Sequence, residues 1–368
     1  MNTPDPTWRI GLVGPLPPPP GGIANQTRQL ARLLQEDHLV VKLVQMNAPY
    51  HPDWIERIRG VRAVFRLVPY VVSLWRLCDR ISVMHVMANS GWSWHLFAAP
   101  AIWIGRIRGV PVVVNYRGGG AEAFFEQSWR WIRPTMSRAS RIIVPSGFLR
   151  DVFGRFHAEA VVVPNVIDLS KFAPHRSYVP CTPGVGGGGP HLIVTRNLED
   201  IYDNATAIRA LALIREHHPE ARMTIAGDGP ERPALEALVQ SLQLTPWVTF
   251  AGRLEVGLLP DLYRSADIML NPSLIDNTPN SILEALASGV PVVSTHVGGV
   301  PYLVEDGSTA LLVPPGEPRA MAEAVCRLMD SPGLVSQLRS NGLEAVGGFQ
   351  WEQVRQVLYG VYREAMEP

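Results

Sequence analysis

Residues 271–301 read NPSLIDNTPNSILEALASGVPVVSTHVGGVP, and their pattern decides the fold. An apolar run ends at the start of this stretch, a polar loop follows with Asp276, and a helical segment then carries Glu284. A second apolar run leads to Gly298 and Gly299. Strand, helix and strand in this order predict a parallel sheet, and open α/β sheets bind ligands at the carboxyl ends of their strands. We therefore expect the acidic pair and the Gly-Gly turn to form a ligand site.

Both acidic residues also have purely structural interpretations. Ser281-Ile-Leu-Glu284 fits a capping box, in which the Glu284 carboxylate would only accept from a backbone N–H at the start of the helix. Thr278-Pro279 can serve as the N-cap and the first helical residue. Asp276 can form an Asx turn with the loop that follows it. The spacing alone leaves the structural and the ligand-binding interpretations about equally open.

The same stretch resembles the retaining glycosyltransferases of family 4. The shared pattern is an acidic residue, seven intervening residues and Glu-Ala, followed by Gly-Val-Pro-Val-Val and a later Gly-Gly-Val-Pro. The resemblance implies the GT-B fold, with two Rossmann-like, doubly wound α/β domains facing a central cleft. It also implies that Glu284 holds the ribose of a nucleotide-diphosphate sugar and that Asp276 holds its sugar hydroxyls. The family usually has Glu at the first position, so the shorter Asp276 leaves the donor sugar open.

Further donor contacts are implied for the C-terminal half. Arg196 follows an apolar run, where the family has an arginine for the donor diphosphate. The lysine that the family has some five residues later is missing, because the only lysines of the chain are Lys42 and Lys171. Leaving-group charge must still be stabilised in the transition state, so we expect Arg117 or Arg253 to compensate. The other donor-binding residues expected in this half are Gly227, Gly229, Asn277, Thr278, and Gly298 with Gly299, whose loop and following helix N-terminus would bind the diphosphate.

Near the start of the chain, a strand expected at Trp8 to Gly14 leads to Gly21-Gly22 and a helix through about Gln35. A strand, a Gly-Gly turn and a helix N-terminus form a place where backbone N–H groups can meet a phosphate. A lone Gly-Gly is more often just a turn. Family 4 has a matching loop near the donor diphosphate, so the resemblance gives this role to Gly21 and Gly22.

Another candidate loop is Tyr116-Arg-Gly-Gly-Gly120, which follows a strand expected at 110–115. Arg117 lies at the carboxyl end of that strand, where a loop points to the ligand edge; the alternative is a flexible turn with a solvent-facing arginine. Many family members have a histidine here, and this chain does not. We therefore assign no catalytic histidine, and expect His85 and His95 to pack or to lie on the acceptor side.

Length and charge indicate two domains that meet different partners. A chain of 368 residues fits two domains of ordinary size. Residues 1–178 contain 21 Lys and Arg against 11 Asp and Glu, whereas residues 179–368 contain 12 against 22. We predict an acceptor-binding N-terminal domain at 1–178, a Gly/Pro-rich linker at 179–190, a nucleotide-sugar-binding domain at 191–350, and a last helix at 351–368 that packs back on the first domain.

Contact with a membrane is an open question at this point. The segment from Trp54 to Arg80 is basic and apolar together, which suits an anionic membrane surface. The alternative, which we favour for most of its length, is a helix packed on the sheet with solvated arginines, broken or kinked at Pro69. No signal peptide or spanning run is visible, and three distant cysteines favour a reducing compartment. We expect a cytoplasmic protein, with peripheral contact at the inner face of the cytoplasmic membrane left open.

Together with the resemblance, these residues predict a retaining hexosyltransferase that acts on a glycan or lipid-linked acceptor in bacterial surface polysaccharide or glycoconjugate synthesis. No cofactor, metal or nucleic acid is expected, and we favour front-face attack with a donor phosphate oxygen as the proton acceptor. Two alternatives remain: a catalytically weak sugar-nucleotide-binding subunit of a glycan assembly complex, and a GT-B-fold nucleotide-sugar epimerase, for which no acid/base pair is evident. The catalytic assignments are Asp276, Glu284, Arg196 and Arg117.

Overall fold

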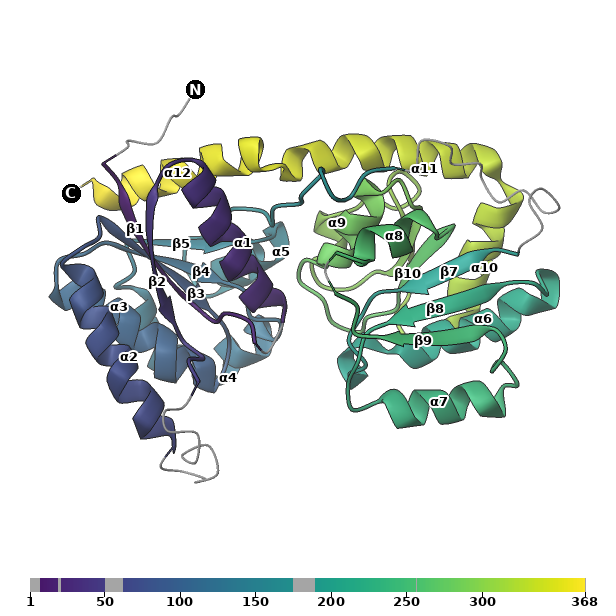
Figure 1. Ribbon diagram of the computed structural model, residues 1–368, viewed down its shortest axis with the longest axis horizontal. Helices are drawn as coiled ribbons and strands as arrows, with labels where there is room; N and C mark the ends of the chain where they lie inside the picture. Colours follow the sequence, from purple (N-terminus) through teal and green to yellow (C-terminus); the bar gives the residue numbers. More distant parts are fainter. Residues whose placement is uncertain (1–6, 19–20, 50–61, 175–188, 256, 368) are drawn as a thin grey trace. The chain divides into compact units, whose positions relative to one another are not determined.

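The structure of the chain is a computed structural model (Figure 1). It describes residues 7–18, 21–49, 62–174, 189–255 and 257–367. The chain divides into two compact units, one formed by residues 1–165 and 351–368 and the other by residues 166–350. Each unit contains a six-stranded parallel sheet with helices packed against it. The predicted fold class, two Rossmann-like α/β domains, is confirmed.

The sheet of the first unit has the strand order β2-β1-β3-β4-β5-β6. Its order reverses at β1, which lies between β2 and β3. The central strands are buried along their whole length, as the apolar runs of parallel sheets are. The strands are β1 (Arg9–Gly14), β2 (Val40–Gln45), β3 (Val83–Ala88), β4 (Val112–Tyr116), β5 (Arg141–Val144) and β6 (Val161–Val162).

The helices of the first unit cover its sheet and include one long helix from the end of the chain. They are α1 (Gly22–Glu36), α2 (Arg62–Cys78), the π-helix η2 (Trp94–Ala98), α3 (Ala99–Ile107), α4 (Ala121–Met136), α5 (Gly147–Arg155) and α12 (Trp351–Met366). We expected a break or a kink at Pro69; helix α2 continues through this residue, so it is not broken there, and the kink stays a prediction. Residues 54–61 of the predicted basic and apolar segment lie outside the described residues.

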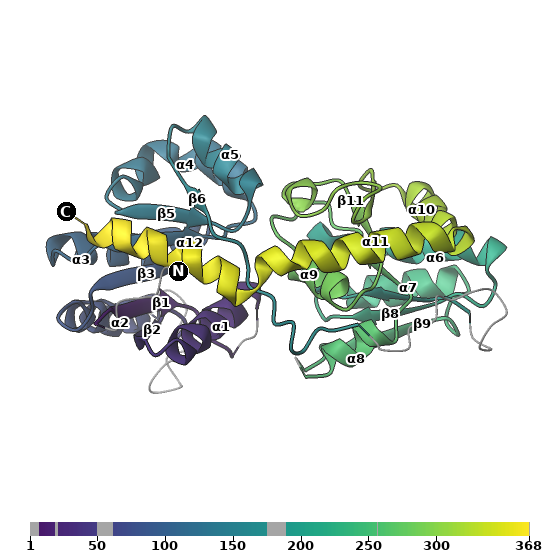
Figure 2. The same cartoon turned by 90° about the horizontal axis from the view of Figure 1, so that it is seen from above.

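Helix α12 packs on β3 and β4 of the first unit (Figure 2). One carboxylate at the end of α1 holds it there. Asp37 accepts hydrogen bonds from Trp351 Nε1 at 3.0 Å, Arg355 Nη1 at 2.8 Å and Tyr359 Oη at 2.6 Å. Val354, Leu358 and Val361 of the expected apolar stripe are buried, whereas Val357 is exposed.

The sheet of the second unit has the order β12-β11-β10-β7-β8-β9. The chain runs from β7 through β8 to β9 on one side, and then crosses to β10 on the other side of β7. The carboxyl ends of β7 and β10 therefore flank the point where the strand order reverses, which is the usual ligand position in such sheets. The strands are β7 (His191–Val194), β8 (Arg222–Ala226), β9 (Val248–Gly252), β10 (Ile268–Asn271), β11 (Val292–Thr295) and β12 (Leu311–Val313).

The second unit begins before the predicted linker. Ile167 and Phe172 are buried in its core, and the Ile167 N–H donates to the Phe349 carbonyl at 2.9 Å. Of the linker predicted at 179–190, residues 179–188 lie outside the described residues. The helices of this unit are η3 (Asp200–Tyr202), α6 (Asn204–His217), α7 (Arg232–Ser241), α8 (Leu259–Arg264), α9 (Asn280–Ala287), η4 (Val300–Tyr302), α10 (Pro318–Asp330), α11 (Pro332–Ala345) and η5 (Val346–Phe349).

Candidate functional site

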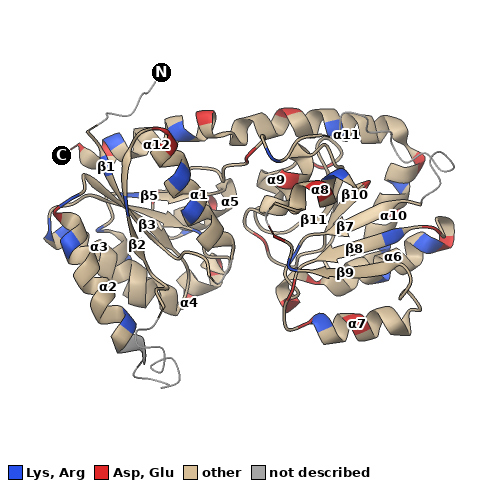
Figure 3. Cartoon of the chain, in the orientation of Figure 1, with Lys and Arg blue, Asp and Glu red and all other residues tan. Residues whose placement is uncertain are grey.

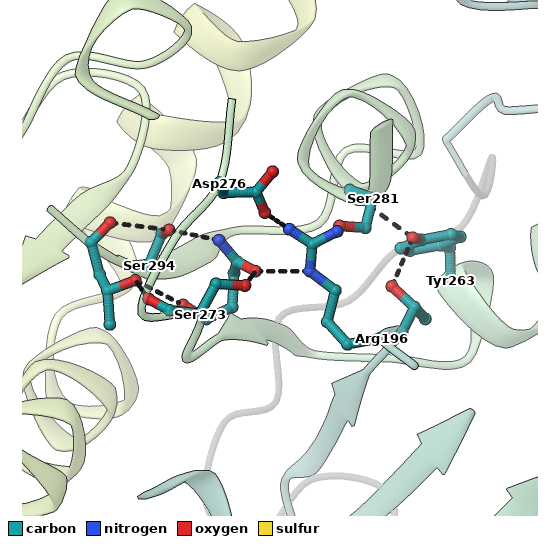
Figure 4. A network of polar contacts seen from close by, with 9 residues as sticks. Arg196, Tyr263, Ser273, Asp276, Ser281 and Ser294 are labelled. Carbon is teal, nitrogen blue, oxygen red and sulfur yellow. Dashed lines mark hydrogen bonds and ion pairs between the residues drawn. The ribbon is translucent and has the colours of Figure 1, made fainter. Parts of the chain in front are cut away.

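The carboxyl edge of the second sheet brings two predicted catalytic residues into contact. Arg196 follows β7 and Asp276 follows β10, and these two strands are hydrogen-bonded neighbours. The Asp276 carboxylate forms an ion pair with the Arg196 guanidinium (Figure 4). Each side chain is only 11% exposed, so the pair is mostly shielded from water. A charged pair thus lies where the strand order reverses.

Two further residues hold the guanidinium of Arg196. Its Nε donates to Asn271 Oδ1 at 2.8 Å, and its carbon lies 4.9 Å from the centre of the Tyr202 ring. Burial lowers the pKa of Arg196 to about 10, so the side chain keeps its charge at neutral pH. A fixed, partly desolvated cation at a strand end is suited to binding a phosphate.

Asn271, which sequence reasoning left out of the site, ties this edge together. Its Oδ1 accepts from Arg196 and from Ser273 Oγ, and its Nδ2 donates to Ser294 Oγ at 2.9 Å. The residue is completely buried. The only signal in the sequence was an amide at the end of the otherwise apolar strand β10.

Glu284 belongs to a second set of contacts, around a buried tyrosine of α8. The Tyr263 hydroxyl donates to Glu284 Oε2 at 2.9 Å and lies 2.8 Å from Thr195 Oγ1. Burial raises the pKa of Glu284, while the hydrogen bond from Tyr263 and the charge of Arg196 lower it. Thr195 and Arg196 are adjacent in the chain, so one strand end supports both acidic residues.

The capping-box interpretation of Glu284 is wrong. Helix α9 begins at Asn280 after Pro279, and no side chain caps its N-terminus. Ser281 is therefore inside the helix, and the Glu284 carboxylate accepts from a tyrosine of another helix instead of a backbone N–H. The side chain is oriented into the polar network and not toward its own helix end.

Four of the six glycines predicted to bind the donor lie in close contact with another loop. A Cβ atom at Gly227 would lie 1.9 Å from the Arg196 carbonyl oxygen, and one at Gly229 would lie 2.3 Å from that of Leu198. At Gly298 and Gly299 the corresponding distances are 2.2 Å to the Asp276 oxygen and 1.6 Å to the Asn277 oxygen. Only glycine allows these loops to approach so closely.

The glycine loop after β11 differs from the expectation in two ways. The Gly299 N–H already donates to the Asp276 carbonyl at 2.8 Å, so it is not directed at a ligand. The helix expected to follow is η4, a single 3₁₀ turn of three residues, which has too few aligned peptides for a strong dipole. The expectation of a helix N-terminus for the diphosphate is wrong. This loop lies against Asp276 and Asn277, and the donor role of Gly298 and Gly299 stays a prediction.

The segment that replaces the family lysine supports Arg196. Residues 200–202 form η3, whose Tyr202 lies against the Arg196 guanidinium. Asp203 then caps α6, because its carboxylate accepts from the Thr206 N–H at 3.3 Å. Arg253 follows the edge strand β9, is exposed, and has no contact with Arg196 or Asp276 within the described ranges. Its compensating role stays a prediction.

In the first unit, Arg117 is held in place and does not face solvent freely. Its backbone N–H donates to the Ala88 carbonyl at 2.9 Å, and its Nη2 donates to Asn165 Oδ1. Burial lowers its pKa to about 10. The interpretation as a flexible, solvent-facing turn is therefore wrong for Arg117. Its catalytic role stays a prediction.

Gly21 and Gly22 lie at the start of α1, and Gly21 is its N-cap. A Cβ at either position would meet no atom within 4 Å, so packing does not require glycine there. The first N–H groups of α1 have no side-chain cap. Such groups are available to an anion, and the donor role of the two glycines stays a prediction.

Known proteins match both units of the chain. The family model described as Glycosyltransferase Family 4 matches residues 20–171, and the one described as Glycosyl transferases group 1 matches residues 190–331. A D-inositol 3-phosphate glycosyltransferase of Actinosynnema mirum is 29% identical over 63% of this chain and 59% of its own length. An alpha-D-kanosaminyltransferase of Streptomyces kanamyceticus is 33% identical over 43% of this chain and 41% of its own. The chain thus spans about half the length of the curated relatives it matches.

Solved structures show the same fold over nearly the whole chain. Sucrose-phosphate synthase from Thermosynechococcus elongatus aligns with a TM-score of 0.76 at 20% identity, covering 97% of this chain and 98% of its own. HepE of Anabaena in complex with UDP and glucose aligns with a TM-score of 0.72 at 19% identity, covering 97% and 99%. These neighbours have the GT-B fold, which is therefore the fold of this chain.

Proposed function

Since the chain belongs to family 4 of the glycosyltransferases, the group 1 glycosyl transferases, we propose that it transfers a hexose-type sugar from a nucleotide-diphosphate sugar, with retention of configuration. The observation that supports this best is the contact of Arg196 with Asp276 beside the Tyr263–Glu284 pair, at the strand ends where such sheets bind ligands. HepE, a structural neighbour, was solved with UDP and with UDP-glucose, which supports a nucleotide-sugar donor here.

In the proposed complex the donor diphosphate binds the Arg196 guanidinium. The diphosphate then replaces part of the contact between Arg196 and Asp276. The Asp276 carboxylate can then accept hydrogen bonds from hydroxyls of the donor sugar. Glu284 binds the ribose hydroxyls, and its hydrogen bond from Tyr263 fixes the orientation of the carboxylate. The Arg196 cation, held in place beforehand, stabilises the negative charge that develops on the leaving diphosphate.

The proposed chemical step needs no protein nucleophile. The acceptor hydroxyl oxygen bonds to the anomeric carbon on the face from which the diphosphate leaves, and the anomeric carbon–oxygen bond breaks. The acceptor proton passes to a phosphate oxygen of the leaving nucleoside diphosphate. Arg196 supplies the positive charge in this proposal, and no metal or cofactor takes part. Activity that is unchanged after treatment with a chelator would support this point.

We propose a glycan or lipid-linked acceptor in bacterial surface polysaccharide or glycoconjugate synthesis, reached at an anionic membrane surface. The exposed side of α2 is apolar, because Phe65, Val68, Val72 and Trp75 are between 41% and 56% exposed. Its opposite side packs on the unit through buried Leu74. The helix therefore presents apolar side chains on both sides, beyond what the packing of the fold requires.

Charge favours a lipid surface over other partners for this side of α2. Helix α2 contains no acidic residue (Figure 3). The nearby Arg76, Arg80 and Arg106 are exposed, and none forms an ion pair with another described residue. In the described part of the chain, no helix is long and apolar enough to cross a bilayer. The unit would thus lie on the surface, with its arginines at the level of anionic head groups.

Vesicle binding tests this contact. Sedimentation with phosphatidylglycerol vesicles should retain the protein, and phosphatidylcholine vesicles should not. Val68→Glu with Val72→Glu should abolish the binding, whereas Trp131→Glu, at a more exposed apolar position on α4, should leave it unchanged. If the double valine variant and Trp131→Glu lose vesicle binding equally, the loss comes from general electrostatic repulsion by the anionic lipid. The binding would then not depend on the exposed side of α2.

Turnover tests the proposed function itself. The wild type is incubated with a panel of radiolabelled sugar nucleotides and membrane extract, and release of nucleoside diphosphate is compared with Glu284→Ala and Asp276→Ala. We expect a loss of about two orders of magnitude or more in each variant. Donor binding without turnover in any extract would favour the binding-subunit alternative. A changed sugar configuration on the recovered nucleotide, without an acceptor, would indicate an epimerase.

A further inference from the structure

Three aromatic rings form an exposed row at the carboxyl edge of the first sheet. The Trp92 ring lies 6.2 Å from the His95 ring at an angle of 68°, and His95 lies 6.1 Å from the Phe124 ring at 73°. Trp92 is 78% exposed and His95 is also exposed, whereas Phe124 is half-buried. We call Trp92, His95 and Phe124 the aromatic platform.

The backbone beneath the platform is held by contacts between two loops. Trp92 follows β3, and Phe124 lies in the first turns of α4, which follows β4. Ser90 Oγ lies 2.8 Å from Tyr116 Oη, and a Cβ at Gly118 would lie 2.1 Å from Ser90 Oγ. The two loops therefore interlock, and the rings on them are positioned before any ligand arrives. Preorganised rings lose little conformational freedom on binding.

The π-helix η2 directs His95 toward Phe124. Its wider turn begins directly after Trp92-Ser93, and it buries Trp94 while leaving His95 on the surface. Helices of this kind are rare and occur often at functional sites.

Other exposed tryptophans of this unit lack these features. Trp75 is covered by the Arg108 guanidinium at 4.7 Å, and Trp103 by that of Arg138 at 4.2 Å. Trp131 is 81% exposed on α4, and no ring of the described residues stacks on it. Exposure by itself is therefore not unusual here. The platform differs because three rings are grouped at the edge where the loops of the sheet bind ligands.

The chemistry of the platform fits a neutral pyranose. One face of such a sugar presents C–H groups that pack on an aromatic ring, while its hydroxyls need hydrogen-bond partners. The His95 ring offers a polar edge, and α4 begins at Ala121 after the N-cap Gly120 with no side-chain cap, so its first N–H groups can donate. Arg117, the basic residue of the same loop, donates from Nη2 to Asn165 Oδ1.

We propose that the aromatic platform binds a pyranose ring of a glycan acceptor. The identification of this glycan as the acceptor rests on the proposed function, but its binding does not require turnover. The proposal sets this chain apart from its relatives named D-inositol 3-phosphate glycosyltransferase, whose named substrate is a phosphorylated cyclitol. The aromatic rings select for the shape of a sugar ring.

Saturation-transfer NMR tests the binding without catalysis. The probes are cellobiose, maltose, lactose and mannobiose, with D-inositol 3-phosphate for comparison. We expect at least one disaccharide to bind the wild type, with its affinity about tenfold lower in Trp92→Ala, the scale of losing one stacked ring. Trp92→Phe should restore part of the affinity, and Trp131→Ala should leave it unchanged.

Each outcome of this test has a distinct meaning. If the disaccharides bind Trp92→Ala as well as the wild type, or if D-inositol 3-phosphate binds and no disaccharide does, the proposal is overturned. In turnover assays Trp92→Ala should raise KM for the acceptor about tenfold and leave KM for the donor unchanged. Disaccharide binding that depends on Trp92, in a protein that shows no turnover, would contradict the proposed function and leave the platform as a glycan-binding site.

Discussion

The carboxylate of Asp276 is the counter-ion of Arg196, and both side chains are about nine-tenths buried. The acidic position that we expected to hold only the donor sugar therefore also neutralises the arginine expected to hold the diphosphate. One residue participates in two parts of the proposed site. A change at either residue should alter both folding stability and ligand binding. These two effects can be measured in separate experiments.

A double-mutant cycle separates these effects. Arg196→Gln and Asp276→Asn should each lower the free energy of unfolding by about 3 kcal/mol, because each leaves a buried charge without its partner. The double variant should regain most of that stability. UDP affinity, measured by calorimetry, should fall at least tenfold in Arg196→Gln and stay low in the double variant, whereas Asp276→Asn should retain it. Wild-type affinity in Arg196→Gln would contradict the assignment of Arg196 to the diphosphate.

Tyr263 should act as a positioning residue for Glu284. Its hydroxyl is within 3 Å of Oε2 of Glu284, and it lowers the pKa of a carboxyl group that burial raises. Tyr263→Phe removes the hydroxyl, so the pKa of Glu284 should rise further. We expect KM for the donor to increase several-fold while kcat changes little, because the ribose contact is remote from the reacting bond.

The pH dependence of donor binding distinguishes this role from a loss of packing. Protonation of Glu284 should weaken binding on the acid side, and this acid limb should move to higher pH in Tyr263→Phe because the pKa of Glu284 is higher there. Glu284→Gln has no carboxyl group to titrate and should lose the limb. An acid limb at the same pH in wild type and Tyr263→Phe would mean that the tyrosine does not act through Glu284.

Gly227 should be required for the position of Arg196. A Cβ atom at this residue would lie 1.9 Å from the Arg196 carbonyl oxygen, so Gly227→Ala must displace the loop after β7. We expect the variant to unfold at a lower temperature, with a loss of about 1–3 kcal/mol, and to bind UDP more weakly. Gly333→Ala is the matched control, because Gly333 lies in α11 with no atom within 4 Å of an added Cβ. Gly333→Ala should keep or raise stability, because alanine lowers the entropy of the unfolded chain. A similar loss in both variants would contradict the loop contact as the cause.

The strands and the donor edge were predictable from sequence because each depends on local pattern. The apolar runs of β7 and β10 end in polar residues, and parallel strands bring such ends to one edge whatever the details of packing. This is why Asp276 could be placed at that edge, whereas the place of Arg196 beside it needed the resemblance. The role of Glu284 needed the resemblance, since its spacing from Ser281 fitted a helix cap equally well.

The partners of these residues were not predictable because they come from distant parts of the chain. Tyr263 reaches Glu284 from α8, and Asn271 joins Arg196 to β11 through Ser294. Nothing in the local sequence of Tyr263 distinguishes it from a core tyrosine. The close loop contacts of four predicted glycines were not predictable for a related reason: a glycine turn is compatible with ligand binding and with loop contact, and the opposing carbonyls belong to other loops.

His85 lies in the middle of β3, fully buried between two polar side chains of the first unit. Asn115 Nδ2 donates to its Nε2 at 3.1 Å, so the neutral ring carries its proton on Nδ1 and donates to Tyr362 Oη at 2.7 Å. A second proton would have to sit on Nε2, facing an amide that is itself a donor. Burial and the charge of Arg117 lower the pKa of His85 to about 3.

Acid should therefore destabilise the first unit through His85. In the unfolded chain the imidazole binds a proton below about pH 6.5, whereas in the folded chain it does so only near pH 3, so the unfolded state gains the proton in between. Stability should fall by about 1.4 kcal/mol for each pH unit lost within this window, from this residue alone.

Urea unfolding of wild type and His85→Gln between pH 7 and 4 measures the difference, because the other titrating groups are common to both. The free energy of unfolding should fall less on acidification in the variant than in the wild type, because the variant takes up about one proton fewer on unfolding. This should hold even if the variant is less stable at pH 7. Parallel pH dependences in the two proteins would show that His85 can be protonated without unfolding.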